Sequence, residues 1–255
     1  MDRRKRKLVV ALVGAIGLSL TIAPADARVV GQVPTNVHIG RLVVTQCGPL
    51  GGLARIAFRS VGSTVFVRSR IVRHDVTVTA INTSLLGSAV AVDSTVFADD
   101  VTVTALNSGL GGSALASAGT WVADDVDVTA INTGTLGSAV AVERSVRARD
   151  VDVTAVNTGL LGTAVAVVDT HRASDVNVTA VNTAPLGTAV AVADTGPSHP
   201  HQSTTSDVTA VNTGILGTAV AVGGGGNGDV TAINTGILGT AVAVGNGGSV
   251  PFPVI

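Results

Sequence analysis

The chain of 255 residues has almost no aromatic side chains, since tyrosine is absent and Phe and Trp together make up 2% of the sequence. Apolar residues nevertheless reach 46%, and most of them are Val, Ala, Leu and Ile. A compact core of this size normally contains larger aromatic fillers. The composition therefore argues against a compact globular core and favours a thin core built from similar small layers.

Cysteine and catalytic groups are also scarce. Cys47 is alone, which excludes an internal disulfide framework and leaves either a small buried apolar residue or an intermolecular disulfide. The five histidines fall outside the repeated segments, and no Ser/His/Asp or Cys/His arrangement is readable. His199 and His201 lie close together but lack further metal ligands. We therefore expect a protein that is not an enzyme and has no catalytic or cofactor-binding residues.

What the chain does contain is one repeated unit, first complete at residues 75–92 (DVTVTAINTSLLGSAVAV). An asparagine marks the centre of each copy: Asn82, Asn107, Asn132, Asn157, Asn182, Asn212 and Asn234. The intervals between these asparagines are 25, 25, 25, 25, 30 and 22 residues. A period in the twenties is typical of solenoids, in which each unit buries its apolar face only against its neighbours. The sequence predicts an all-β fold, a β-solenoid or β-helix of stacked coils.

Each copy reads as strand, turn, strand. Residues 75–80 alternate with period 2, and position 77 becomes Asp127 and Asp152 in later copies, so this position faces water. The last two copies lack two residues here, which keeps every side chain on its original face. An Asn-Thr-Gly turn follows, whose residues we expect at positive φ, and residues 88–92 form the second strand. The link to the next copy keeps an alanine in register (Ala98, Ala123, Ala148 and Ala173), which predicts a short third strand.

Four regions are expected along the chain. Residues 1–27 read as a secretory signal peptide, with a basic start, an apolar stretch too short for a bilayer span of about 20 residues, and an A-x-A cleavage site at 25–27. Residues 28–73 read as an atypical, basic N-terminal cap with strands near 41–45 and 63–72, in which residues 46–52 align with 182–188 of a later copy. Residues 74–244 are the seven-copy array, and 245–255 are a C-terminal tail or cap.

Charge is unevenly distributed in the chain that would remain after cleavage at Ala27. Residues 28–73 hold seven Arg and no acidic residue, whereas residues 74–255 hold four Arg against 15 acidic residues. This asymmetry favours head-to-tail contact between molecules or contact of the basic end with an anionic surface, and a merely solvated cap is the alternative. After cleavage the remaining chain would contain arginine but no lysine, and in a sequence rich in Ala, Val, Gly and Asp this indicates a bacterial source.

Stacking the copies about 4.8 Å apart would bring identical residues into files along one axis. The asparagines would then form an amide ladder that fixes the register. A second file would consist of aspartates: Asp75, Asp100, Asp125, Asp150, Asp175, Asp207 and Asp229. Carboxylates about 5 Å apart repel one another by roughly 1 kcal/mol in water, so this file needs an explanation. Its side chains could cap backbone N–H groups, bind Ca²⁺ between coils, or stay partly protonated.

The strand-turn-strand unit with its asparagine file resembles, in pattern, the repeats of curli-type functional amyloids, although the Ser/Gln/Gly/Asn motif of those repeats is absent. The resemblance implies a secreted or cell-surface structural protein whose partner is itself, in a homo-oligomer, a fibre or a surface layer. The alternative is an adhesin module that binds a surface or a cell-wall polysaccharide through flat Thr, Asn and Asp rows. We expect no nucleic-acid partner, and no membrane span once the signal peptide is removed.

Overall fold

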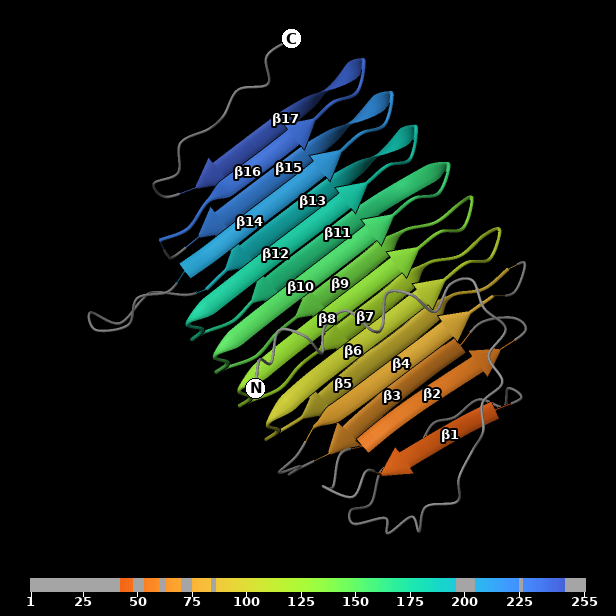
Figure 1. Cartoon of the computed structure of the whole chain (residues 1–255), viewed down its shortest axis with the longest axis vertical. Helices are drawn as coiled ribbons and strands as arrows, with labels where there is room; N and C mark the ends of the chain where they lie inside the picture. Colours follow the sequence, from red (N-terminus) through yellow and green to blue (C-terminus); the bar gives the residue numbers. More distant parts are fainter. Residues whose placement is uncertain are drawn as a thin grey trace, which may run out of the picture.

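The computed structural model describes residues 42–47, 53–59, 63–69, 75–83, 86–195, 205–224 and 227–245. Within these ranges the protein is an all-β solenoid of about six turns without a helix, which confirms the predicted fold class. Its coils follow one another along the long axis of the molecule (Figure 1). The expected signal peptide at 1–27 and nearly all of the expected tail at 245–255 lie outside the described residues, and they stay predictions.

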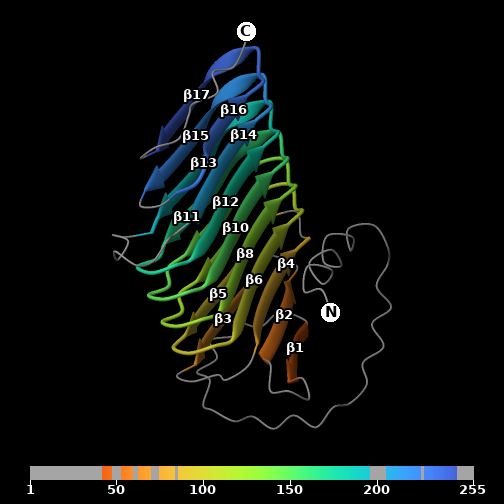
Figure 2. The ribbon, with the colours of Figure 1, turned by 60° about the vertical axis from the view of Figure 1, so that its left-hand side comes forward.

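Two sheets form the walls of the solenoid and lie in separate layers (Figure 2). The nine strands of sheet A are β1 (Leu42–Cys47), β2 (Leu53–Arg59), β4 (Val76–Asn82), β6 (Asp100–Asn107), β8 (Asp125–Asn132), β10 (Asp150–Asn157), β12 (Asp175–Asn182), β14 (Thr205–Asn212) and β16 (Val230–Asn234). The eight strands of sheet B are β3 (Ser63–Ser69), β5 (Ala89–Thr95), β7 (Ala114–Ala118), β9 (Ala139–Glu143), β11 (Leu161–Asp169), β13 (Leu186–Asp194), β15 (Leu216–Gly224) and β17 (Leu238–Gly245).

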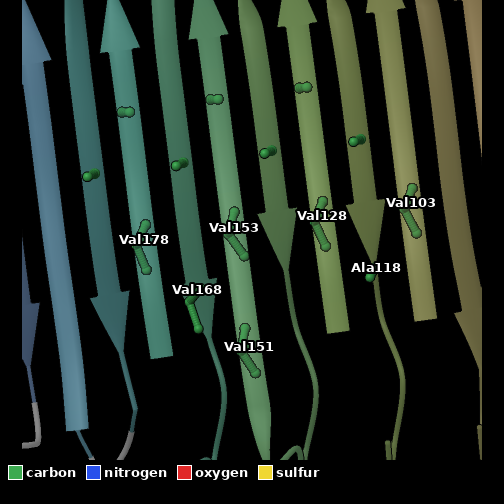
Figure 3. Close-up of a cluster of buried hydrophobic side chains, with 14 of the residues drawn as sticks. Val103, Ala118, Val128, Val151, Val153, Val168 and Val178 are labelled. Atoms are coloured by element: carbon green, nitrogen blue, oxygen red, sulfur yellow. The ribbon is translucent and has the colours of Figure 1, made fainter. Parts of the chain in front are cut away.

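Identical positions of successive coils are aligned in both sheets. In β10 and β12, for example, Val151 pairs with Val176 and Asn157 pairs with Asn182, and both strands run in parallel. From β4 to β12, each sheet A strand contributes two valines and an alanine to the core, and these face alanines of sheet B (Figure 3). These small side chains fill a narrow interior, which explains why the array needs no aromatic residues.

The turn between the two sheets depends on glycine rather than on asparagine. Among the described residues no residue other than glycine has a positive φ, so the expected left-handed Asn-Thr-Gly turn is wrong. Instead, the later fixed glycine takes that conformation in four coils, as at Gly137 with φ of 138°. A Cβ atom on Gly137 would lie 1.7 Å from the carbonyl oxygen of Gly112, so this position has no room for a side chain. The asparagine is extended and contributes its side chain to the core.

The third side of the coil, which links sheet B to the next sheet A strand, does not form a full strand. Ala98, Ala123, Ala148 and Ala173 are buried, as the alanine register indicates. Next to them only single parallel bridges form, from Phe97 to Val122 and from Val122 to Arg147. The array therefore has two sheets and a short linking side, instead of three full sheets.

The region before the array differs from the expectation in its register. β1 pairs with β2 in antiparallel orientation, and Gln46 lies opposite Ala54. β2 then pairs in parallel with β4, with Arg59 opposite Asn82. Arg59, and not Gln46, therefore occupies the asparagine position, so the alignment of residues 46–52 with 182–188 is wrong. The strand β2 was not expected at all, whereas β1 and β3 lie close to the two predicted strands.

Candidate functional site

The seven asparagines form one continuous ladder inside the solenoid. The Nδ2 atom of each asparagine donates to the Oδ1 atom of the asparagine in the next coil, over 2.6 Å from Asn82 to Asn107 and 2.8 Å from Asn212 to Asn234. The bonds between these two pairs measure 2.7 to 2.8 Å. The first six asparagines are fully buried. A buried amide without a partner is costly, so the ladder penalises any slip of one coil against the next.

The aspartates form a shorter file than the sequence indicated. Asp75, Asp100, Asp125, Asp150 and Asp175 occupy equivalent positions at the start of successive sheet A strands. Asp207 pairs with Asn177, and Asp229 precedes the pair of Val208 with Val230. These two residues therefore belong to the neighbouring outward file, and Thr205 occupies the position of Asp175 in its coil. The seven-member aspartate ladder is thus corrected to five members.

Two carboxylates of that neighbouring file have neutral donors within reach. Asn177 Nδ2 donates to Asp152 Oδ1 over 2.9 Å, and the backbone N–H of Asp229 donates to Asp207 Oδ1 over 2.9 Å. The caps on these carboxylates thus come from the following coil. In the described part of the chain, no three His, Cys, Asp or Glu residues gather as a metal site would require. Calcium binding between coils has no donor cluster to support it there.

Sequence reasoning missed a second polar file, which lies inside the solenoid. Thr95, Thr120, Ser145, Thr170 and Thr195 are buried side by side at the end of sheet B. Two carboxylates lie beside this file at one inward position of sheet B, Asp93 in β5 and Glu143 in β9, with Ala118 between them. The alternation of each strand gives the signal, because Asp93 continues the inward positions of Ala89 and Ala91.

Asp93 is held by hydroxyl groups of two coils. Thr95 Oγ1 donates to Asp93 Oδ1 over 2.6 Å, and Thr120 Oγ1 donates to Asp93 Oδ2 over 3.2 Å. Burial raises the pKa of Asp93 from its ordinary value of 3.8 to about 6, although both hydroxyls oppose the rise. The charge of Asp93 in the folded chain therefore changes at mildly acidic pH, near 6.

Glu143 is the largest fully buried side chain of the array. Thr170 Oγ1 donates to its Oε2 atom, while Oε1 and the hydroxyl of Ser145 have no hydrogen-bond partner among the described residues. Burial raises the pKa of Glu143 from 4.5 to about 7, and the negative charge of Asp169 adds to the rise, whereas the nearby hydroxyls of Ser145 and Thr170 oppose it. A proton on Glu143 would leave this buried carboxyl group uncharged, which its burial favours.

The outer face of sheet A is polar. Beyond the two carboxylate-bearing files it carries an unbroken threonine file and an aliphatic file beside it. The threonines are Thr79, Thr104, Thr129, Thr154, Thr179, Thr209 and Thr231, and all are partly exposed. The asparagines lie on the opposite, inner side of the same strands, so they are not available to a ligand. Of the Thr, Asn and Asp rows expected for an adhesin, only the threonine and aspartate rows therefore lie on the outer face.

The outer face of sheet B is different, because its central files contain no charged residue. One file is Val90, Leu115, Val140, Val165, Val190, Val220 and Val242, and the next is Val92, Ser117, Val142, Val167, Val192, Val222 and Val244. A hydroxyl file from Ser88 to Thr240 runs beside them. Beyond it lies a leucine file from Leu86 to Leu238, which Gly111 interrupts and whose leucines are 36 to 63% exposed. We call this set of four files the valine face.

None of the described elements is a helix of the length and hydropathy that a membrane crossing needs. The exposed ion pairs Arg144–Asp169 at 4.0 Å and Arg149–Asp124 at 3.5 Å lie along the linking side, where water weakens them. No known family model, no curated protein and no solved structure matches this chain.

Proposed function

We propose that this protein is an exported structural repeat protein that associates with copies of itself, in a fibre or a layer at the cell surface. The observation that carries the proposal is the register of the coils. Successive coils contact one another through aligned backbone pairs and the same asparagine bond, and from β4 to β12 through the same two valines. Strands stacked in register are also the arrangement by which separate chains join, so strands of a second molecule can add at an open end of these sheets.

The last described coil supports growth along the coil axis. β16 and β17 stand at the ends of the strand orders of sheets A and B, and each pairs with one neighbour among the described strands. Ala241 and Ala243 in β17 are only partly buried there, although their counterparts in earlier coils are fully covered. Strands of a second molecule added beside β16 and β17 would cover these alanines.

Export rests on the N-terminal sequence, with its basic residues, its apolar stretch and the cleavage site at 25–27. Expression of the whole chain in a bacterial host, followed by mass spectrometry of the product outside the cytoplasm, tests this part. We expect a mature chain that begins at Arg28. A product that retains residues 1–27 and stays in the cytoplasm would remove the exported location from the proposal.

Electron microscopy and fibre diffraction test the association itself. We expect unbranched fibres with a reflection near 4.8 Å along the fibre axis, because the strands lie across that axis. Ala241→Lys, which places a charge on the inner side of the last coil, should abolish fibre growth. Thr231→Lys is the matched control, since it places the same charge on the outer face of the same coil and should leave growth intact.

Two results would contradict the proposal. One is a chain that stays dispersed at high concentration, with no fibre or layer under any pH tested. The other is fibre growth that Ala241→Lys leaves unchanged, because growth would then not use the end of the coil stack. The melting temperature of each variant monomer shows whether the substitution disturbs the rest of the array.

Adhesion to a polysaccharide is the second candidate, and the unbroken threonine file on sheet A favours it. Hydroxyl groups at a regular spacing of about 4.8 Å can bond to a repeating glycan. A pull-down on cell-wall polysaccharide by a soluble monomer, lost in Thr154→Lys and Thr179→Lys, would support adhesion instead of assembly. An ice surface is a related target, for which thermal hysteresis would be the readout.

A further inference from the structure

The two sheets of the array have different sequence patterns, although they share one core. Sheet A strands alternate, as in DVDVTAVN of β10, so the inner face is apolar apart from the asparagine and the outer face is polar apart from one valine. Sheet B strands are apolar on both faces, as in LGTAVAVVD of β11, where Ala164 and Ala166 point inward and Val165 and Val167 point outward. In parallel sheets, such a continuous apolar run is typical of strands that are covered on both faces.

No described element covers the outer side of sheet B. Among the described strands, only the eight odd-numbered strands of sheet B, β3 to β17, belong to this layer, and sheet A lies on its inner side (Figure 2). The valine face therefore remains as a continuous uncharged surface across seven strands from β5 to β17. Exposed apolar patches of this extent on soluble proteins mark an interaction site.

We infer that the valine face is the surface through which two copies of this chain pack against each other, sheet B against sheet B. This inference deepens the proposed self-association, because it names the surface and makes the partner a second copy. The pairing is lateral, so it differs from growth at the end of the coil stack. It would give four layers of sheet, with the aspartate-bearing faces of both copies outside in water.

The spacing of the files favours a second copy over another partner. Valines repeat along the face at the strand spacing of about 4.8 Å and form straight rows with grooves between them. Rows of this kind interdigitate best with rows of the same spacing, and a second valine face provides them over its whole length. A partner without this repeat would contact only some of the rows.

The size of the face fits a stable dimer. Seven strands at about 4.8 Å and seven residues at about 3.3 Å give roughly 34 by 23 Å, or about 780 Å² for each copy. Two copies would then bury about 1,600 Å² in total, which is the usual size of a specific interface.

The distribution of charges around the valine face also agrees with a dimer interface. Arg144, Asp169 and Asp194 lie at the border with the linking side, and all three are exposed. They form a polar rim, while the centre contains no charge that pairing would have to remove from water.

Sedimentation velocity of the purified full chain from about 1 to 100 µM tests the inference. We expect a dimer for the wild type and a monomer for Val165→Lys combined with Val190→Lys, which places two charges in the centre of the face. The matched control is Thr154→Lys combined with Thr179→Lys, on the outer face of sheet A in the same two coils. It should stay dimeric, and circular dichroism should show the same β-structure in all three proteins.

A wild type that is monomeric at 100 µM would overturn the inference, and so would a dimer that only the sheet A variant dissociates. Val165→Cys, in a chain that also carries Cys47→Ser, identifies the occupant. Its thiol should react freely in dilute monomer and become protected as the dimer forms. Protection in the monomer would show that another segment of the same chain covers the face, and would refute pairing between copies.

The two proposals can fail separately. Dimers without fibres would contradict growth along the coil axis but leave the valine face as the interface. Fibres that form equally well with Val165→Lys and Val190→Lys, from a wild type that never dimerises, would contradict the valine face as an interface but would agree with growth along the coil axis.

Discussion

Thr170 Oγ1 donates a hydrogen bond to the carboxylate of Glu143, which belongs to the preceding coil. Both side chains are buried, so the bond joins two coils from inside the core. It satisfies one carboxylate oxygen and leaves the other, Oε1, without a partner among the described residues. The arrangement suits a protonated carboxyl group better than an ionised one, and the stability of the array should therefore depend on pH.

Glu143→Gln should make the array more stable at alkaline pH. In the wild type the pKa of Glu143 is about 7 when folded and near 4.5 when unfolded, so the unfolded chain loses its proton first as pH rises. The stability that the protonated group provides is complete below pH 4.5 and is lost by pH 7, which corresponds to about 3 kcal/mol. Urea unfolding from pH 4 to 8 should show equal stabilities at pH 4 and a more stable variant at pH 8. A wild type that gains stability over this range relative to the variant would contradict the prediction.

Asp93→Asn should change the stability of the array at more acidic pH than Glu143→Gln does. The pKa of Asp93 rises from 3.8 to about 6 on folding, so its contribution falls between these two values and is lost above pH 6. The variant should exceed the wild type by about 3 kcal/mol at pH 7 and match it near pH 3.5. Thermal melts at both pH values provide the measurement, and Asp99→Asn, at an exposed carboxylate of the same coil, is the control that should change little.

Asn157→Ala should be far more damaging than Asn234→Ala. Asn157 accepts from Asn132 and donates to Asn182, both over 2.8 Å, so its loss leaves two buried groups without partners. Each such group costs about 1 to 3 kcal/mol, which predicts a loss of about 2 to 6 kcal/mol for the two. Asn234 accepts one bond only, at a partly exposed position, and its loss should cost about 1 kcal/mol. Denaturant midpoints of the two variants should differ clearly, and equal midpoints would mean that the ladder does not stabilise the array.

Gly137→Ala should disrupt its coil, whereas Gly119→Ala should be nearly neutral. A Cβ on Gly137 would meet the backbone oxygen of Gly112 at 1.7 Å, and its φ of 138° is unfavourable for alanine. Steric overlap and backbone strain together should cost about 3 kcal/mol or more. A Cβ on Gly119 would meet its nearest atom, the oxygen of Asp93, at an ordinary 3.7 Å. Hydrogen exchange should show faster opening around Gly137 in the first variant only, and similar protection in both would refute the steric argument.

Much of the fold could be predicted because the same position can be compared in several copies of the repeat, and its variation shows whether it faces water. Val76, Val78 and Ala80 were expected to face inward from the variation at position 77, and all three are fully buried. The two-residue deletion before Asn212 does preserve the direction of each side chain, since Val208 pairs with Val178. The same deletion moves Asp207 to another file, a consequence that alignment of the DV dipeptides alone conceals.

The remaining errors have two physical causes. Residues before the array have no repeat to support them, so nothing in Gln46 or Arg59 indicated which of them lies at the asparagine position of the coil. Asp93 and Glu143 were overlooked because carboxylates are usually exposed, and only strict counting along the strand places them inside. Their burial is the most informative departure from the general pattern, since it introduces the pH dependence.

The link between sheet B and the next coil varies in length without disturbing the strands on either side. Asn182 and Asn212 are adjacent in the ladder although 30 residues separate them, and Asn212 and Asn234 are adjacent across 22. Foreign peptides inserted at this link would therefore emerge at chosen heights along a rigid rod. An engineer could space guest epitopes along it in steps of a single strand width.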